Sequence, residues 1–475
     1  MLPPERMYHM NIYLLSDFGS TYTKVTAVDI DSAKIVAFAK AFTTIETDVN
    51  MGFDAAKKEI AAQLGTAQFE KSLGASSAAG GLKMVSSGLV PDLTAKASRL
   101  AAASAGAKVV KTYAYELTEA ENEEIATIAP DIVLLSGGID GGNKRVLLHN
   151  AEVIASVAAD FSVIIAGNRS AAAQAAEILQ RGGKNTVVCE NVMPKFGQLN
   201  ILPAKAAIRD LFIANIITAK GLDDVQKIMD MEIIPTPLAV FEACELLSKG
   251  SGAEEGLGEL MAYDLGGATT DVYSMADGNP KIPNAFINGI VEPFAKRTVE
   301  GDVGMRYSLT ALYDLILEGS PEAFYQEHGI SQDDVSKWLE ICAADPGILP
   351  IDEYKQYSNV DSAFAAEAMR ISAARHAGFN EKVYTPAGEM HSQSGKDLTQ
   401  VRYVIGSGGA VINTANPRAI MANTAYSPRD GNALKPLHPT ILLDVENCLA
   451  AMGLLSRFAP EAALRIMKDS FKEVQ

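Results

Sequence analysis

The amino-acid sequence predicts an α/β protein built from two related domains. The main observation is a repeat: the stretch Asp17-Phe-Gly-Ser-Thr-Tyr-Thr-Lys24-Val25 recurs, altered, as Asp264-Leu-Gly-Gly-Ala-Thr-Thr-Asp271-Val272. Each copy follows an apolar run and places an Asp first, a Gly two positions later, and a Thr and a Val near its end. Between the copies, short apolar segments alternate with helical patterns, which favours parallel pairing. At 475 residues, the chain is also too long for one ordinary core.

The first half opens with strands and continues as an α/β alternation. Residues 11–16 and 25–30 are predicted as strands that flank the first glycine turn, and residues 33–43 as a third strand. The helix predicted at 118–129 has an acidic first turn, as the helix dipole prefers. The other predicted strands are 108–110, 131–135, 162–166 and 186–188, and the other predicted helices are 53–64, 92–105, 149–159, 169–181 and 238–249.

The second half begins after the turn-rich segment 250–258. Residues 321–385 form a predicted helical, charged insert that holds the only tryptophan. The chain then returns to a strand at 402–405 and closes with a helix near 444–457. The predicted organisation is a leader at 1–10, an N-terminal domain at 11–249, and a C-terminal domain at 250–475 that contains the insert.

Composition narrows the classes of function. The net charge of −17 argues against a nucleic-acid partner, because phosphate backbones are held by Lys and Arg. No apolar run reaches the ~18 residues needed to span a bilayer, and the N-terminus lacks the apolar core of a signal peptide. The four cysteines are scattered, and no two of the six histidines have metal-ligand spacing. A reduced cytoplasmic protein with no membrane or nucleic-acid partner is expected.

The two glycine turns are candidate phosphate sites. Glycine lets a phosphate approach the backbone without a Cβ in the way, and successive N–H groups then point at its oxygens. Gly19, Ser20 and Thr21 fit this pattern in the first copy, and Gly266, Gly267 and Ala268 fit it in the second. One such turn is as well explained as an ordinary hairpin, but a pair of them favours a nucleotide held between two domains.

Acidic residues at these turns are candidate metal ligands. The carboxylates of Asp17, Asp264 and Asp271 are the hard oxygen ligands that Mg²⁺ prefers, and they would bind it through water molecules. Lys24 either neutralises a phosphate or lies on the outer face of its strand. Because Lys24 in the first copy corresponds to Asp271 in the second, the first copy is predicted to face phosphate and the second to face the metal.

A third glycine motif follows the strand at 402–405. Gly406, Ser407, Gly408 and Gly409 are small enough for a ribose or a flat base to lie on the backbone. Alone the motif is weak, and an ordinary strand-to-helix turn is the commoner explanation. In the first half, Ser136-Gly-Gly138 is interpreted as the counterpart of this third motif, kept from the duplication for structural reasons and not for nucleotide binding.

Together these motifs resemble the phosphate-1, phosphate-2 and adenosine motifs of the actin/Hsp70/sugar-kinase ATPase superfamily. The resemblance implies an α/β fold of two ribonuclease-H-like domains, from an internal duplication, around a Mg·ATP cleft. By position it implies catalytic acidic roles for Asp17 and Asp264. It also implies phosphate contacts from the hydroxyls of Ser20, Thr21 and Thr269.

Other stretches resemble the glutamate mutase L family. They are Ile132–Gly142, Asn191–Pro194, Glu232–Pro237, Arg297–Arg306 and Asp397–Gly409. This resemblance implies an ATP-driven, chaperone-like protein that reactivates an adenosylcobalamin-dependent mutase or aminomutase, with ATP and Mg²⁺ as cofactors and the mutase as partner. No motif for binding cobalamin itself is present. Glu300, before a turn and a helix, either faces the nucleotide or caps the helix.

The sequence departs from the motifs of these ATPases at two places, and three other functions are considered. The segment Ile234-Pro-Thr-Pro237 lacks the glutamate that chaperone ATPases carry there, and Ala410-Val411 replaces the arginine that often stacks on adenine. The main alternative is a small-molecule kinase of the same superfamily, although no substrate-facing catalytic Asp is evident. A radical-enzyme activator is disfavoured by the scattered cysteines. A filament protein that binds nucleotide only structurally is the non-enzymatic alternative.

Overall fold

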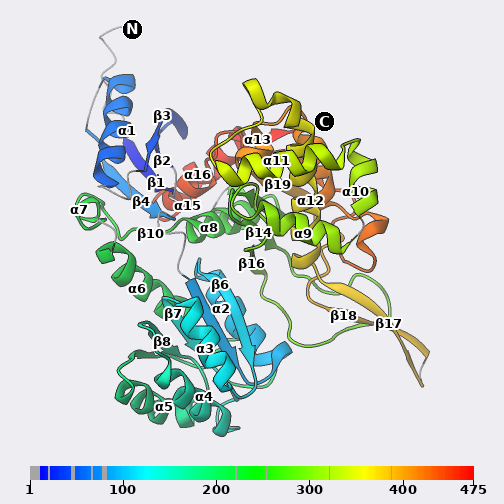
Figure 1. Ribbon diagram of the computed structural model, residues 1–475. Coiled ribbons are helices and arrows are strands. Elements are labelled where there is room, and N and C mark those ends of the chain that lie inside the picture. The colour runs from blue at the N-terminus through cyan, green and yellow to red at the C-terminus, as the bar shows by residue number, and fades with distance from the viewer. Residues whose placement is uncertain are drawn as a thin grey trace. The chain divides into compact units, whose positions relative to one another are not determined.

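The computed structural model describes residues 11–19, 22–43, 49–65, 68–77, 83–219, 222–252, 254–319, 321–386 and 388–474. The predicted leader 1–10 lies outside these residues. The chain divides into two units (Figure 1): Met1–Gly256 with Cys448–Asp469, and Leu257–Asn447 with Ser470–Gln475.

The first unit contains a five-stranded sheet in the order β3-β2-β1-β4-β10. Its strands are β1 (Ile12–Phe18), β2 (Tyr22–Asp29), β3 (Lys34–Phe42), β4 (Lys71–Ser76) and β10 (Ile234–Pro235). The first three strands form the predicted antiparallel opening, and β4 and β10 run parallel to β1. Because β1 continues to Phe18, Asp17 lies within the strand and not in the turn.

Helices from both ends of the chain cover this sheet. Helix α1 (Val49–Leu64) packs on β2 and β3, and α15 (Leu449–Ser456) packs on β1, β4 and α8 (Thr236–Lys249). A Cβ at Gly453 of α15 would lie 1.8 Å from the Ala239 carbonyl oxygen, so only glycine permits this close approach. Residues Leu449–Leu455 are buried on all sides. Cys448–Asp469, in which helix α16 (Pro460–Ser470) begins, therefore belongs to the first unit. The sequence prediction, which assigned all of 250–475 to the second domain, is wrong for this segment.

A second sheet is inserted in the first unit between β4 and β10. Its five strands are all parallel, in the order β6-β5-β7-β8-β9. They are β5 (Lys83–Gly88), β6 (Lys108–Ala114), β7 (Ile132–Leu135), β8 (Ser162–Ile165) and β9 (Asn185–Val188). The helical segments between and after them are η1 (Pro91–Ala95), α2 (Lys96–Ser104), α3 (Glu119–Ile128), α4 (Arg145–Ser156), α5 (Arg169–Arg181), α6 (Leu202–Ala219) and α7 (Asp223–Gln226). The α/β alternation predicted here is confirmed.

The interpretation of Ser136-Gly-Gly138 as the first-half counterpart of the third glycine motif is wrong. These residues follow β7 of the inserted sheet. The strand of the first sheet that corresponds to β19 of the second unit is β4, because each lies parallel to the first strand of its own sheet. Its end reads Gly74-Ala75-Ser76. A glycine pair after an apolar strand is a local pattern, and only strand pairing shows which sheet that strand joins.

The second unit repeats the strand order of the first sheet. Its main sheet runs β16-β14-β13-β19-β20-β21, with β13 and β14 as the hairpin and β19 and β20 parallel to β13. The strands are β13 (Leu260–Leu265), β14 (Thr270–Met275), β16 (Ala295–Glu300), β19 (Tyr403–Ser407), β20 (Thr440–Leu443) and β21 (Lys472–Glu473). Numbered from each hairpin, both sheets have the order 3-2-1-4-5. This shared order confirms the prediction of two related ribonuclease-H-like α/β domains.

The range 321–385, predicted as an insert, supplies part of the core of the second unit. Helix α12 (Ser358–His376) packs on β13 and β14, and Trp338 of α11 (Gln332–Ala344) is fully buried in the same core. The other elements of the second unit are α9 (Leu309–Glu318), α10 (Pro321–His328), η2 (Asp352–Tyr357), α13 (Gly409–Ile412), α14 (Pro417–Met421), η3 (Ala422–Thr424), η4 (Pro428–Asp430), β15 (Ala285–Ile287), β17 (Phe379–Thr385) and β18 (Gly388–Ser394). The short strands β11 (Gly250–Ser251) and β12 (Glu254–Glu255) belong to the first unit. Among the described residues, no helix is both long enough and apolar enough to cross a membrane.

Candidate functional site

The first glycine turn is the tip of the β1–β2 hairpin. The Gly19 amide donates to the Tyr22 carbonyl at 3.1 Å and closes the turn. Asp17 and Lys24 stand directly opposite each other on the two strands, so the pair carries opposite charges on one face of the sheet. Ser20 and Thr21, the other predicted phosphate residues here, lie outside the described residues.

The Asp17 carboxylate is held by a residue far along the chain. The Thr236 hydroxyl donates to Asp17 Oδ1 at 2.6 Å. Thr236 is the first residue of α8 and follows β10, which is parallel to β4. Burial raises the pKa of the Asp17 carboxyl, while Lys24 and the Thr236 hydrogen bond oppose that rise. The sequence drew attention to this segment only for its missing glutamate, so the role of Thr236 was missed.

We expect Thr236→Val to destabilise the protein by about 1–2 kcal/mol, because a hydrogen bond to a carboxylate is lost at a partly buried position. Thr236→Ser keeps the hydroxyl and serves as the matched control, with an expected loss below ~0.5 kcal/mol. Urea unfolding followed by circular dichroism measures both values. Equal stability of the valine and serine variants would show that the hydrogen bond contributes nothing.

The second glycine turn has the same construction in the second unit. The Gly266 amide donates to the Thr269 carbonyl at 3.0 Å, which matches the bond that closes the first turn. Asp264 pairs directly with Asp271 across the β13–β14 hairpin, in the register that joins Asp17 to Lys24. The correspondence inferred from the repeated sequence therefore holds residue by residue in the hairpins.

The carbonyl groups of this turn accept hydrogen bonds from the segment that precedes α9. The amide of Met305 donates to Gly266 O at 3.0 Å, the amides of Arg306 and Tyr307 donate to Gly267 O at 2.8 and 2.9 Å, and the Ser308 hydroxyl donates to Ala268 O at 2.6 Å. Among the described residues, no hydrogen bond uses the amides of Gly267, Ala268 or Thr269. Three successive free N–H groups on a partly exposed turn have the chemistry of an anion-binding nest.

Asp271, a predicted metal ligand, has a buried arginine as its partner. Arg297 Nε donates to Asp271 Oδ1 at 2.7 Å, and its Nη2 lies 2.6 Å from the same oxygen. Directly opposed carboxylates destabilise a sheet, so Asp264 and Asp271 require cations nearby. Arg297 supplies one positive charge, and Mg²⁺ at this pair would supply more. The sequence did not single out Arg297 individually for this role.

Glu300 is the last residue of β16 and stands opposite Thr270. Its carboxylate oxygen lies 3.1 Å from Arg375 Nη1, and the same nitrogen lies 2.7 Å from Asp302 Oδ1. Glu300 is therefore ion-paired within the second unit, and a direct contact with a ligand stays a prediction.

The third glycine motif lies beside Asp264. Ser407 ends β19 and is the parallel partner of Asp264 in β13. Gly408 has φ +94°, and a Cβ there would lie 2.3 Å from the Leu265 carbonyl oxygen, so a side chain cannot be accommodated. Gly406 lies within β19, two residues before Gly408, and Gly409 is the first residue of α13. The structure thus brings the third glycine motif next to the Asp264–Asp271 pair.

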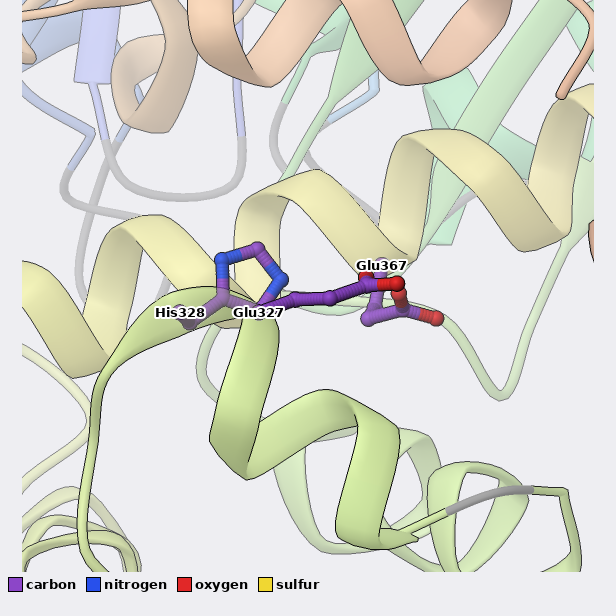
Figure 2. Close-up of side chains that lie close together, drawn as sticks. All are labelled: Glu327, His328 and Glu367. Atoms are coloured by element: carbon purple, nitrogen blue, oxygen red, sulfur yellow. The ribbon is translucent and has the colours of Figure 1, made fainter.

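One further group of side chains has metal-ligand spacing. Glu327 and His328 on α10 and Glu367 on α12 place three ligand atoms within 4.8 Å of one another (Figure 2). Arg429, however, ion-pairs with both Glu327 and Glu367, at 3.1 Å for the latter, and Arg370 Nε donates to Glu367 at 2.8 Å. Burial lowers the pKa of His328. Because two arginines already neutralise the carboxylates, we interpret this partly buried group as an ion-pair network and not as a site for a divalent cation.

Known proteins resemble the chain over almost its whole length. A family model described as MutL protein matches residues 13–471. Protein MutL of Clostridium tetanomorphum is 43% identical over 467 residues, which cover 98% of this chain and 100% of that protein. Among solved structures, nucleotide-free acetone carboxylase has 12% identity and a TM-score of 0.42, covering 94% and 70% of the two chains. A xylulose kinase from Bifidobacterium adolescentis has 12% identity and a TM-score of 0.30, covering 96% and 93%.

Proposed function

Because the chain belongs to the MutL protein family, we propose that it is an ATP-hydrolysing, chaperone-like protein. Its partner is an adenosylcobalamin-dependent mutase or aminomutase of the glutamate mutase type, which it reactivates. The observation that carries the nucleotide part of this proposal is the second glycine turn. Its carbonyl groups are bound from one side, while the amides of Gly267, Ala268 and Thr269 have no acceptor among the described residues.

The residues present fit a magnesium–nucleotide complex. The free amides of the second turn bind phosphate oxygens, and Lys24 adds positive charge at the first turn. Asp264 and Asp271 would hold Mg²⁺, and Arg297 fixes the orientation of Asp271. The side-chain-free turn at Gly408 receives the nucleoside. When bound, Mg·ATP supplies the γ-phosphoryl group and a cation that neutralises charge on it.

Asp17 is the candidate base for the attacking water. Burial raises the pKa of the Asp17 carboxyl, and a higher pKa makes a carboxylate a stronger base. Thr236 holds one oxygen, Oδ1, so the other oxygen has a defined direction. Hydrolysis is useful to a chaperone only if the ATP and ADP states differ in their affinity for the mutase. In this proposal, that difference in affinity lets ATP hydrolysis drive the reactivation of the mutase.

The experiment measures phosphate release from ATP by the purified protein, alone and with a mutase inactivated by bound hydroxycobalamin. We expect slow release alone, and a recovery of mutase turnover that requires both ATP and Mg²⁺. Protein without ATP, and ATP without protein, are the controls. Absence of nucleotide binding would end the ATP proposal, and phosphate transfer to a small acceptor without mutase recovery would favour the kinase alternative.

A further inference from the structure

A groove runs along the outer edge of the inserted sheet in the first unit, with a cavity volume of about 430 Å³. One wall of the groove is β6. The other wall is the helical segment η1–α2, and the residues of this segment that line the groove lie three or four positions apart, so they share one face of the helix. The residues that line the groove are Pro91, Asp92, Ala95, Lys96 and Arg99 on the helical wall, and Val109, Val110, Lys111, Thr112 and Ala114 on the strand wall.

The strand wall is an edge with unpaired backbone groups. Within the described part of the chain, β6 pairs only with β5, so its other edge has no neighbouring strand. Edge strands offer N–H and C=O groups that an extended peptide can pair with, which is the basis of β-augmentation. The stretch Val109–Ala114 spans ~20 Å at about 3.3 Å per residue, enough for five or six peptide residues. Val110 sits at a register shift and is 42% exposed, so it offers an apolar contact.

The groove is basic although the chain is acidic. Lys96, Arg99 and Lys111 line it against a single acid, Asp92, while the whole chain carries a net charge of −17. Lys111 also ion-pairs with Glu124 at 2.8 Å, but both side chains are about half exposed, at 47% and 41%. Such an exposed ion pair contributes little to stability, so Lys111 can exchange Glu124 for a carboxylate of a bound peptide. The charge pattern therefore favours an acidic occupant.

A second copy of the chain is a poor occupant of this edge. Pairing two β6 edges would bring the lysines of one strand, including Lys108 and Lys111, against those of the other. Like charges opposed across strands are destabilising. A peptide with alternating acidic and apolar residues meets both the cations and Val110.

We propose that this groove binds an extended, acidic peptide segment of a partner protein. The segment adds a strand to β6 and places its carboxylates against Lys96 and Arg99. The inference rests on the groove, its unpaired edge and its charge, and it does not depend on ATP binding.

Fluorescence anisotropy of a labelled octapeptide of alternating Glu and Val, titrated with the full-length protein, tests the proposal. A peptide of alternating Lys and Val is the matched probe. We expect the acidic peptide to bind, the basic peptide not to bind, and the Lys96→Glu/Arg99→Glu variant to weaken binding at least ~10-fold. The control variant is Lys58→Glu/Arg181→Glu, which reverses two exposed charges outside the groove and should bind as tightly as the wild type.

Hydrogen exchange locates the bound peptide even if a charge-reversal variant folds poorly. The amides of β6 should exchange more slowly when the acidic peptide is present. Equal binding of both peptides, unchanged affinity of the groove variant, or protection only outside β6 would each overturn the proposal. Preferred binding of a DNA oligonucleotide over the acidic peptide would also overturn it, in favour of a nucleic-acid site.

Discussion

Replacing Asp264 with alanine should reduce the rate of ATP hydrolysis at least ~100-fold, because the removed carboxylate is the proposed magnesium ligand at the reacting phosphate. Its free energy of unfolding should change little. Asp264 stands directly opposite Asp271, so its removal relieves like-charge repulsion across the hairpin. A steady-state phosphate-release assay, repeated over a range of Mg²⁺ concentrations, measures the effect, together with urea unfolding of the same variant.

The matched control for this variant is Asp314→Ala, which removes an exposed carboxylate from α9 of the same unit. It should hydrolyse ATP at the wild-type rate. If Asp264→Ala lost stability while the residual folded fraction kept full activity per molecule, Asp264 would have a structural role only. Nucleotide-dependent activity that needs no Mg²⁺ in the wild type would also contradict the metal assignment.

The second large effect is expected at Asp361, which joins the core of the second unit to the glycine turn. Its Oδ1 accepts hydrogen bonds from Arg306 Nη1 at 2.8 Å and from Trp338 Nε1 at 3.1 Å, and all three side chains are mostly or fully buried. Asp361→Ala leaves a largely buried guanidinium without its counter-ion, which typically costs ~3–5 kcal/mol. Burial raises the pKa of Asp361, and its two partners only partly offset the rise. We therefore expect a value near the lower end, about 3 kcal/mol.

The same variant should weaken nucleotide binding, because the amide of Arg306 anchors the Gly267 carbonyl. Urea unfolding followed by far-UV circular dichroism measures stability, and emission of Trp338, the only tryptophan, reports the local change. Asp361→Asn keeps an acceptor for Trp338 and should fall between the wild type and the alanine variant. A loss below ~0.5 kcal/mol in Asp361→Ala would contradict the proposed role of this ion pair.

The hairpins were predictable because their determinants are local. Each is set by an Asp, a Gly and a short turn within nine residues, and the closing bond joins groups three positions apart. The inserted parallel sheet was predictable as strands and helices, from apolar runs and helical periodicity. Its identity as a separate sheet was not, because strand order depends on pairing between segments far apart in the chain.

Contacts over long sequence separations account for what sequence reasoning missed at the site. Thr236 reaches Asp17 across 219 positions, and Arg297 reaches Asp271 from the neighbouring strand. An apolar helix at the end of the chain was recognised as a helix, but its packing on α8 of the first unit depends on the small Gly453. No periodicity in the sequence indicates which helix a glycine faces.

The sequence by itself determined the repeated glycine turns, the two-domain α/β class and the family. These depend on short motifs whose backbone geometry is dictated by a few adjacent residues. Only the tertiary structure decided that Lys24 stands opposite Asp17, whereas Asp271 stands opposite Asp264 and is paired with Arg297. It also decided that three amides of the second turn have no acceptor among the described residues, and that a basic groove borders β6. Charge balance and hydrogen-bond satisfaction are properties of neighbours in space, and the fold, not chain order, determines which residues become neighbours.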